Sequence, residues 1–235
     1  MRQFGLLVLA LLGVTQLGSA DPIACVSGTL ASYIALGSGG CTIGTNLLSD
    51  FTETSFLTGA TNISPSDLTV TPIGGTTNPG ITIDGSSIMA NTGQTFDALI
   101  NYVVSGNSYT SDTITLAGTN ATGNGAVTDI QNFCQNGNFS APTFVKGCPG
   151  GEGPGSPQVL LGDGSSMASV AASSLGITDN VTIDSGGAGT ASGGTITDQF
   201  AAVATSAVPE PSTFVLSALG LALAVGRKLR TILKN

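Results

Sequence analysis

Hydrophobic and polar residues alternate with a period of two along much of the middle of the chain. Such alternation, rich here in threonine, valine and isoleucine, is typical of strands with one buried face. It occurs, in places only approximately, at residues 68–73, 81–84, 96–104, 112–116, 158–161, 181–184 and 195–197. Glycine, asparagine, serine and proline clusters separate these segments, and Asp84-Gly85 and Asp163-Gly164 are candidate hairpin turns.

Short strands at this spacing favour a mainly β fold, an antiparallel β-sandwich-like domain, over alternating strands and helices. No amphipathic helix is predicted between residues 60 and 200. Earlier in the chain, residues 29–36 form an apolar piece that fits either a strand or a short helix. The glycine- and proline-rich stretch at 151–157 is an exposed loop or a soft boundary within the domain, near residues 150–157.

The N-terminus has the layout of a cleaved secretory signal peptide. One positive charge at Arg2 precedes an apolar run over residues 4–14, which is too short for a stable membrane anchor. Small residues at Gly18 and Ala20 then predict cleavage by signal peptidase between Ala20 and Asp21. An uncleaved N-terminal anchor is one alternative, and lipoprotein processing at Cys25 is another, although Pro22-Ile23-Ala24 is a poor lipobox.

The C-terminus carries three features in order: a proline-rich hexapeptide, an apolar stretch and a basic cluster. These are Val208, Pro209, Glu210, Pro211, Ser212 and Thr213, then residues 214–226, then Arg227, Lys228 and Arg230. A helix over 214–226 would span roughly 20 Å at ~1.5 Å per residue, short of a ~30 Å hydrocarbon core. The basic cluster places its end in the cytoplasm, which leaves the preceding domain on the outer side of the membrane.

This order of features resembles the PEP-CTERM sorting tail of Gram-negative bacteria, over residues 208–230. The resemblance implies recognition by an exosortase-type membrane enzyme near Pro209-Glu210-Pro211, followed by cleavage and release or transfer to the cell surface. Cysteine, glycine and aromatic positions within residues 25–44, 96–104 and 134–148 are similar to those of an uncharacterised group of PEP-CTERM ectodomains. That similarity implies a β-rich surface domain and supplies no catalytic residues.

The expected organisation therefore has three parts: a signal peptide at 1–20, a β-rich extracellular domain at 21–207 and a sorting segment at 208–230. The domain is flanked by an N-terminal signal helix and a C-terminal hydrophobic helix. The protein is expected to be held transiently in the inner membrane through the C-terminal helix, and then to reach the cell surface or the medium.

Charge and composition exclude several classes of function. Between the two end segments, 13 acidic residues face one basic residue, Lys146, for a formal charge of −12. A nucleic-acid partner is excluded, because binding it needs a basic patch. The chain has no histidine, so no Ser-His-Asp or Cys-His machinery can be built. Paired carboxylates could serve a glycosidase, but nothing in the sequence places two together, and the protein is not expected to be an enzyme.

Four cysteines, Cys25, Cys41, Cys134 and Cys148, lie in a chain expected to reach an oxidising compartment. They allow three connectivities, of which the two local pairs, Cys25 with Cys41 and Cys134 with Cys148, are favoured. Each local bridge closes a loop of about 15 residues, worth roughly 3 kcal/mol. No C-x2-C pair is present to favour a zinc site.

The function expected from these features is a structural or adhesive component of exopolysaccharide or biofilm. A secreted carbohydrate- or calcium-binding β-sandwich module is the alternative. Sugar contacts would come from aromatic residues, most of which are expected in the core: Phe51, Phe56, Tyr102, Tyr109, Phe139 and Phe144. Calcium would use turn oxygens at Asp163 and at Asp179 to Asp184, although the EF-hand spacing is absent; no other cofactor is expected.

Overall fold

The computed structural model describes residues 23–58, 63–75, 77–137, 148 and 158–203. The expected signal peptide, its cleavage site at Ala20 and Asp21, both flanking helices and the sorting segment 208–230 lie outside these residues.

Within the part that is described the fold is mainly β, as the alternation predicts. The strands are β1 (Ile23–Ala24), β2 (Gly28–Thr29), β3 (Cys41–Ile43), β4 (Asn46–Thr58), β5 (Thr69–Ile73), β6 (Gly80–Asp84), β7 (Met89–Ala90), β8 (Thr95–Ala117), β9 (Asn120–Thr122), β10 (Ala126–Gln135), β11 (Gln158–Leu161), β12 (Gly164–Asp184), β13 (Thr190–Ser192) and β14 (Thr195–Val203). The helical pieces are α1 (Leu30–Ile34) and the 3-10 helix η2 (Gly37–Gly39).

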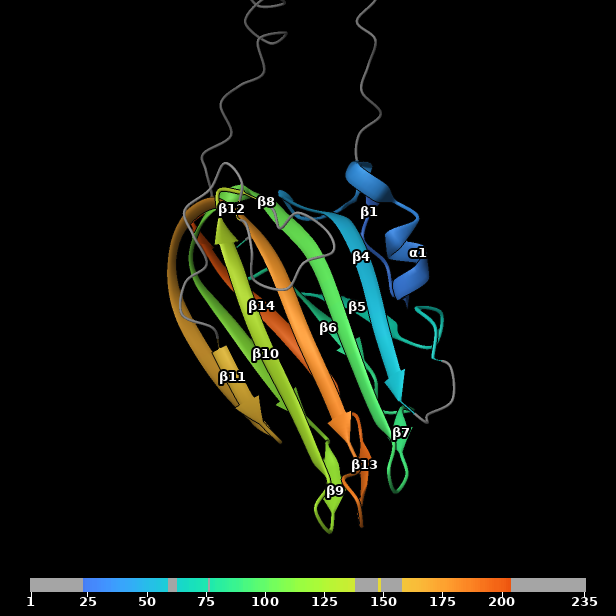
Figure 1. Ribbon diagram of the computed structural model, residues 1–235. Helices are drawn as coiled ribbons and strands as arrows, with labels where there is room; N and C mark the ends of the chain where they lie inside the picture. Colours follow the sequence, from blue (N-terminus) through green and yellow to red (C-terminus); the bar gives the residue numbers. More distant parts are fainter. Residues whose placement is uncertain (1–22, 59–62, 76, 138–147, 149–157, 204–235) are drawn as a thin grey trace, which may run out of the picture. The chain divides into compact units, whose positions relative to one another are not determined.

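Two long strands, β8 and β12, form the spine of the main sheet (Figure 1). They pair antiparallel along nearly their whole lengths, from Thr95 opposite Asp184 to Leu116 opposite Gly164. The other edge of β8 pairs first with β4, over its N-terminal half, and then with β14, over its C-terminal half. Strands β10 and β11 extend the sheet beyond β12, whereas β6, β5 and β2 extend it beyond β14.

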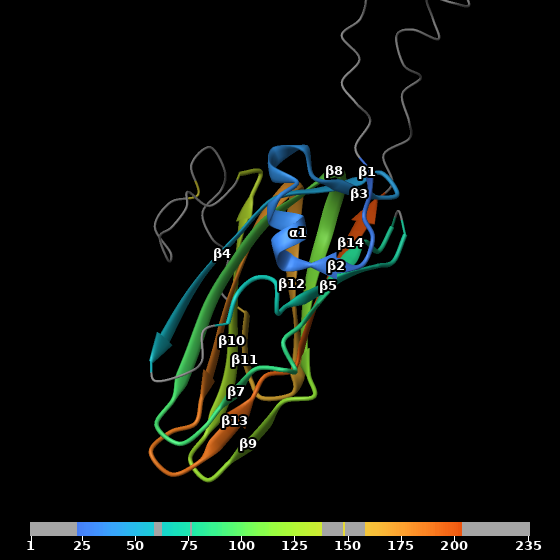
Figure 2. The same cartoon turned by 90° about the vertical axis from the view of Figure 1, so that its right-hand side faces the viewer.

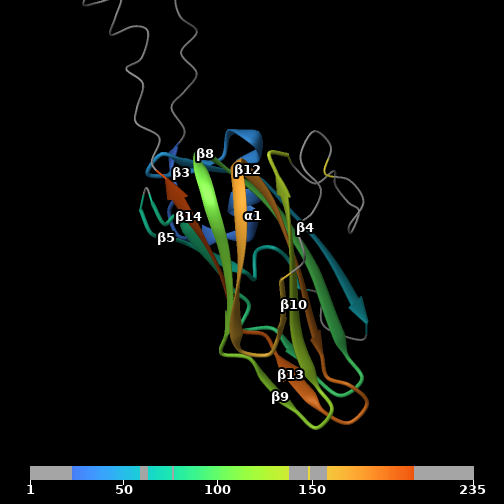
Figure 3. The same ribbon diagram turned by 90° about the vertical axis from the view of Figure 1, so that its left-hand side faces the viewer.

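The main sheet curls because both spine strands bend near their midpoints (Figures 2 and 3). The register between β8 and β12 shifts at Ala172, and Gly106 in β8 lies at the same level with a φ of 107°. Bulges of this kind increase the local twist and bend the strand. One half of the curled sheet then faces the other across the core. The mainly β expectation is confirmed, but the main sheet is one continuous curled sheet of eleven described strands rather than the two sheets of a sandwich.

The apolar piece at residues 29–36 forms α1, the helical one of its two expected conformations. Thr29 caps the helix, since its Oγ1 accepts a hydrogen bond from the Ser32 backbone N–H at 3.2 Å. The helix buries Leu30 and Tyr33, and the Tyr33 ring lies edge-on to Phe51 of β4 with 5.1 Å between centroids. The helix thus covers the β4 side of the core.

The two ends of the folded body differ in what they carry. A separate sheet of three short strands, in the order β7-β13-β9, lies at one end (Figure 1). Strand β1 and the C-terminal end of β14 lie at the other end (Figure 2). The first and last described residues are therefore both distant from the small sheet.

Both expectations of a hairpin at an Asp-Gly pair are wrong. Asp84-Gly85 follows β6, but the next strand, β7, pairs with β13 in the small sheet. Asp163-Gly164 joins β11 to β12, yet among the described strands β11 pairs only with β10. Asp84 instead accepts from the Ser86 N–H two residues on, whereas Asp163 accepts from the N–H groups of Gly118 and Thr119, which follow β8.

Candidate functional site

Seven polar side chains meet in the interior between the two halves of the curled sheet. This carboxyl network consists of Tyr102 and Asp112 of β8, Asp129 and Gln131 of β10, Gln158 of β11, Asp179 of β12 and Asp198 of β14. The four aspartates are at most 1% exposed. Aspartate is almost never fully buried unless it is paired, so this cluster is the most unusual chemical feature of the described chain.

Asp198 lies at the centre of the carboxyl network. Its Oδ2 accepts a hydrogen bond from the Tyr102 hydroxyl at 2.5 Å, and its Oδ1 accepts one from Gln131 Nε2 at 2.8 Å. Because β14 pairs with neither β10 nor the N-terminal half of β8, both bonds cross the core. They therefore join the facing halves of the sheet.

The two glutamines extend the carboxyl network to the edge strand β11. Gln131 and Gln158 are direct cross-strand partners, and Gln158 Nε2 donates to Gln131 Oε1 at 2.8 Å. The same Nε2 lies 3.4 Å from Asp112 Oδ2 on the C-terminal half of β8. Gln158 thus connects β11 both to its neighbour β10 and to the opposite layer.

Many carboxylate oxygens in the carboxyl network lack a donor. Within the described residues, Asp112 Oδ1 and both oxygens of Asp129 and Asp179 are buried without a well-aligned hydrogen bond. A buried polar atom left unsatisfied costs about 1–3 kcal/mol, and more if it is charged. All six basic residues of the chain also lie outside the described residues. No described side chain can therefore form an ion pair with these four aspartates.

Burial shifts the pKa values of the carboxyl network upwards. Loss of solvation, and then the proximity of Asp198, raises the pKa of Asp112, Asp129 and Asp179 well above the usual aspartate range. Burial also raises the pKa of Asp198, but only to about 6, because hydrogen bonds from Tyr102, Asp179 and Gln131 favour its ionised form. Burial and the nearby aspartates likewise raise the pKa of Tyr102 well above its usual value.

A second buried polar group, formed by Asn46, Asn107 and Tyr109, contains only neutral side chains, in contrast to the carboxyl network. Asn46 Oδ1 accepts hydrogen bonds from Asn107 Nδ2 at 2.7 Å and from the Tyr109 hydroxyl at 3.0 Å. Asn46 Nδ2 donates to the Ile43 carbonyl at 3.1 Å. These uncharged groups are hydrogen-bonded to one another and hold β4 against the bend of β8. Their role is therefore structural.

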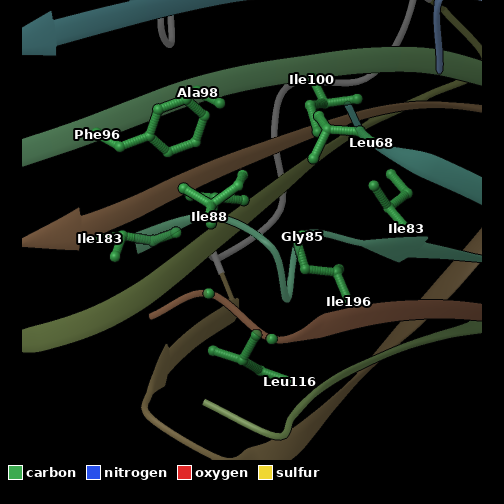
Figure 4. Close-up of a pocket in the computed structure, with 13 residues that line it drawn as sticks. Leu68, Ile83, Gly85, Ile88, Phe96, Ala98, Ile100, Leu116, Ile183 and Ile196 are labelled. Atoms are coloured by element: carbon green, nitrogen blue, oxygen red, sulfur yellow. The ribbon is translucent and has the colours of Figure 1, made fainter. Parts of the chain in front are cut away.

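An apolar cavity lies within the hydrophobic core but is too small for an organic ligand (Figure 4). Its lining includes Phe96 and Ile100 of β8, Ile183 of β12 and Ile196 of β14. The cavity volume is about 20 Å³, roughly the space of one water molecule. Ligand pockets are usually larger by an order of magnitude.

The residues expected to bind calcium do not come together in one site. Both Asp163 oxygens already accept hydrogen bonds from Gly118 and Thr119, Asp179 is buried in the carboxyl network, and Asp184 Oδ1 accepts from Gly186 and Thr95. No group of three aspartate, glutamate, cysteine or histidine side chains in the described part is placed to hold a metal ion.

The aromatic residues considered for sugar binding are mostly in the core. Phe51, Tyr102 and Tyr109 are each at most 2% exposed, and Phe51 stacks on Tyr102 with 5.1 Å between centroids. The positions of the Phe56 side chain, Phe139 and Phe144 lie outside the described residues. The described aromatics therefore form core packing.

The structure joins Cys25 to Cys41 and Cys134 to Cys148, which are the two local pairs that the sequence favours. The Cα atoms lie 4.9 Å apart in the first pair and 5.5 Å apart in the second. The first bridge fixes β1 and β3 to each other, whereas the second attaches Cys148 to the end of β10.

The described part of the chain contains no helix that could cross a bilayer. With its bridged, mainly β body, the chain has the features of an exported protein. The family model for the PEP-CTERM protein-sorting motif matches residues 207–230, so this segment is similar to the tails of PEP-CTERM sorting domain-containing proteins. The motif marks an exported protein that an exosortase sorts after transient anchoring in the membrane. No curated protein and no solved structure matches the chain.

Sequence reasoning found the sorting motif, but its residues Val208 to Thr213, Arg227, Lys228 and Arg230 lie outside the described residues. It missed the carboxyl network. The available signal was an aspartate or glutamine at inward positions of alternating strands, as in Asp129-Ile-Gln131 and Asp198. Polar residues at those positions are usually taken to face solvent, and the alternation predicts no strand over residues 126–135, where Asp129 and Gln131 lie.

Proposed function

We propose that the mature domain is a non-catalytic structural component of the extracellular polysaccharide, delivered there by exosortase processing. The sorting motif at residues 207–230 carries the proposal, because it commits the protein to processing outside the cytoplasm. The domain works without a bound cofactor. Its partners are signal peptidase and the exosortase-type enzyme during export, and polysaccharide afterwards.

The shape and surface of the domain support this role. The described body has a continuous β core, and the apolar cavity beside Phe96 has a volume of only about 20 Å³. The small sheet, at the end distant from β1 and from the C-terminal end of β14, presents neutral groups: Asn120, Ala121 and Thr122 of β9 are all exposed. Hydroxyl and amide groups without charge suit hydrogen bonding to hydrated sugar chains.

The processing step is tested in the host by immunoblotting of membrane, surface and medium fractions. Replacing Pro209, Glu210 and Pro211 together by alanine should leave a full-length protein in the inner membrane. A matched control is the double alanine variant of Thr205 and Ser206, which lies just before the matched motif and should be processed like the wild type. Release of the first variant at the wild-type level contradicts exosortase processing.

The matrix role is tested separately, with purified domain 21–207 and polysaccharide from the same host. The domain should co-sediment with the polysaccharide, and a deletion strain should lose cohesion of its biofilm until the full gene is restored. A domain that is released normally but stays in the supernatant contradicts the matrix role and leaves the export conclusion standing.

A further inference from the structure

The negative charge of the carboxyl network needs compensation from some source. Four buried aspartates approach one another, and none of the residues that the structure describes is basic. Three sources remain: bound protons, a metal ion, or Lys146, which lies outside the described residues. The arrangement of acidic side chains in the described part does not suit a metal ion, because no three of them are placed around one point.

Hydrogen bonding favours protons as the source. As carboxylates, Asp129 and Asp179 only accept, and none of their four oxygens has an aligned donor among the described groups. As a carboxylic acid, Asp179 becomes a donor and bonds to Asp198, which already accepts from Tyr102 and Gln131. Protonation therefore converts an unsatisfied acceptor into the third donor around Asp198.

We propose that the carboxyl network is a proton-held clasp: Asp112, Asp129 and Asp179 keep their protons at neutral pH around an ionised Asp198 and lose them as the pH rises, which loosens the β10–β11 pair from β8 and β14. The clasp joins elements that no backbone ladder joins. Gln131 connects β10 to β14, and Gln158 connects β11 to the C-terminal half of β8.

The titratable groups that face the clasp come from every strand around it. Strand β8 contributes Tyr102 and Asp112, β10 contributes Asp129, β12 contributes Asp179 and β14 contributes Asp198, while β11 contributes only the neutral Gln158. Burial raises the pKa of two half-buried acids elsewhere: Glu53 on β4, which has a side-chain hydrogen bond with Ser55, and Asp97 on β8, which accepts a hydrogen bond from Thr182 Oγ1. These two acids also contribute to the pH dependence of unfolding, and the contribution of the clasp is measured on top of theirs.

The sign of the pH effect follows from linkage. A carboxyl whose pKa is raised by folding holds a proton that the unfolded chain has released, so unfolding becomes easier as the pH rises. The stability that these protons contribute is fully present below the unfolded pKa of about 4 and is lost as the pH rises through the folded pKa values. This dependence of stability on pH is opposite to that of proteins whose carboxylates form ion pairs, which lose stability as the pH falls.

The first experiment measures denaturant unfolding of the oxidised domain between about pH 5 and about pH 8. The equilibrium constant for unfolding should rise about tenfold per pH unit for each proton that only the folded state retains. Amide protection factors in β10 and β11 should fall with pH before those in β4. Infrared spectra of the folded protein should show protonated carboxyl bands at about pH 7, well above the unfolded aspartate pKa. A stability that is flat or rises over this range overturns the proposal.

Variants then locate the protons. Asp179→Asn mimics a protonated carboxyl, so it should fold, reduce the pH slope by about one proton and remove one infrared band. Asp129→Asn gives the same test if Asp179→Asn fails to fold. The matched control is Asp163→Asn, because Asp163 is fully exposed and hydrogen bonds from Thr119 and Gly118 lower its pKa. That variant should keep the full slope over this pH range.

Two further measurements separate protons from the other sources of charge. Adding calcium or EDTA at constant pH should leave the melting temperature unchanged; a rise with calcium and a fall with EDTA assign the site to a metal. Lys146→Gln should also keep the pH slope. If that variant changes the slope as much as Asp179→Asn does, lysine compensates the charge and the proton clasp is wrong.

Discussion

At the scale of single residues, the hydrogen bond from Tyr102 to Asp198 should show which charge state the core prefers. The 2.5 Å bond favours the ionised form of Asp198. Tyr102→Phe should therefore raise the pKa of Asp198 above its present value of about 6. It should cost about 1–3 kcal/mol of unfolding free energy, more above about pH 7 than below about pH 5.

Denaturant unfolding at the two pH values measures this difference, and Tyr109→Phe is the control. The Tyr109 hydroxyl donates to the uncharged Asn46 Oδ1, so its loss should cost the same at both pH values. Equal costs at both pH values for Tyr102→Phe would contradict an ionised Asp198 in the neutral-pH fold.

Gly106 is the residue on which the bend of β8 depends. Its φ of 107° is a conformation that other residues rarely adopt, and a Cβ there would lie 2.3 Å from the Thr45 carbonyl oxygen. Gly106→Ala should lower the unfolding free energy by about 2–4 kcal/mol, by calorimetry or denaturant titration. Gly75→Ala, where a Cβ meets no atom within 4 Å, should change it little.

At the scale of elements, the alternating pattern predicts the positions of several strands correctly but not where one strand ends and the next begins. The segments at 81–84 and 158–161 coincide with β6 and β11, whereas those at 96–104 and 112–116 are two halves of the single strand β8. The polar Ser105-Gly106-Asn107 between them reads as a break in sequence, but in the structure it is a bend within one strand. Strand β10 was missed because Asp129 and Gln131 occupy its inward positions.

The bridge between Cys25 and Cys41 should stabilise the N-terminal elements by limiting the unfolded chain. It closes a sequence separation of 16 residues around α1 and η2. Replacing both cysteines by alanine should lower the unfolding free energy by about 3 kcal/mol and should remove part of the sensitivity of the melting temperature to reductant. The alanine pair at Cys134 and Cys148 is the comparison. It should leave the protection of α1 amides against hydrogen exchange unchanged, and a loss of that protection would contradict separate roles for the two bridges.

At the scale of the whole molecule, the sequence predicts the destination of the protein better than its interior. The sorting motif could be recognised because three features lie in fixed order along the chain. The carboxyl network could not, because its seven members come from five strands that meet only after the sheet curls. Asp112 and Asp198 are 86 positions apart in numbering, and nothing local to either shows that both are buried.

The excess of acid over base should make the stability of the domain depend on salt. Residues 21–207 carry a formal charge of −12, and the carboxyl network adds repulsion within the core as the pH rises. Raising the ionic strength from about 0.01 M to about 0.1 M shortens the screening length from about 30 Å to about 10 Å. The melting temperature should therefore rise, by about 2–4 °C for each kcal/mol of repulsion removed.

Surface and core repulsion can be separated with the double variant Asp67→Asn and Asp84→Asn. Each of these exposed aspartates accepts a backbone N–H, from Ser64 and Ser86, and asparagine keeps an oxygen for that bond. The variant should respond less to salt than the wild type, while its dependence on pH above about pH 5 should stay the same, because the carboxyl network is shielded from ions in solution. If salt removed the pH dependence as well, the charges responsible would lie at the surface, and the interior carboxyls would have no part in it.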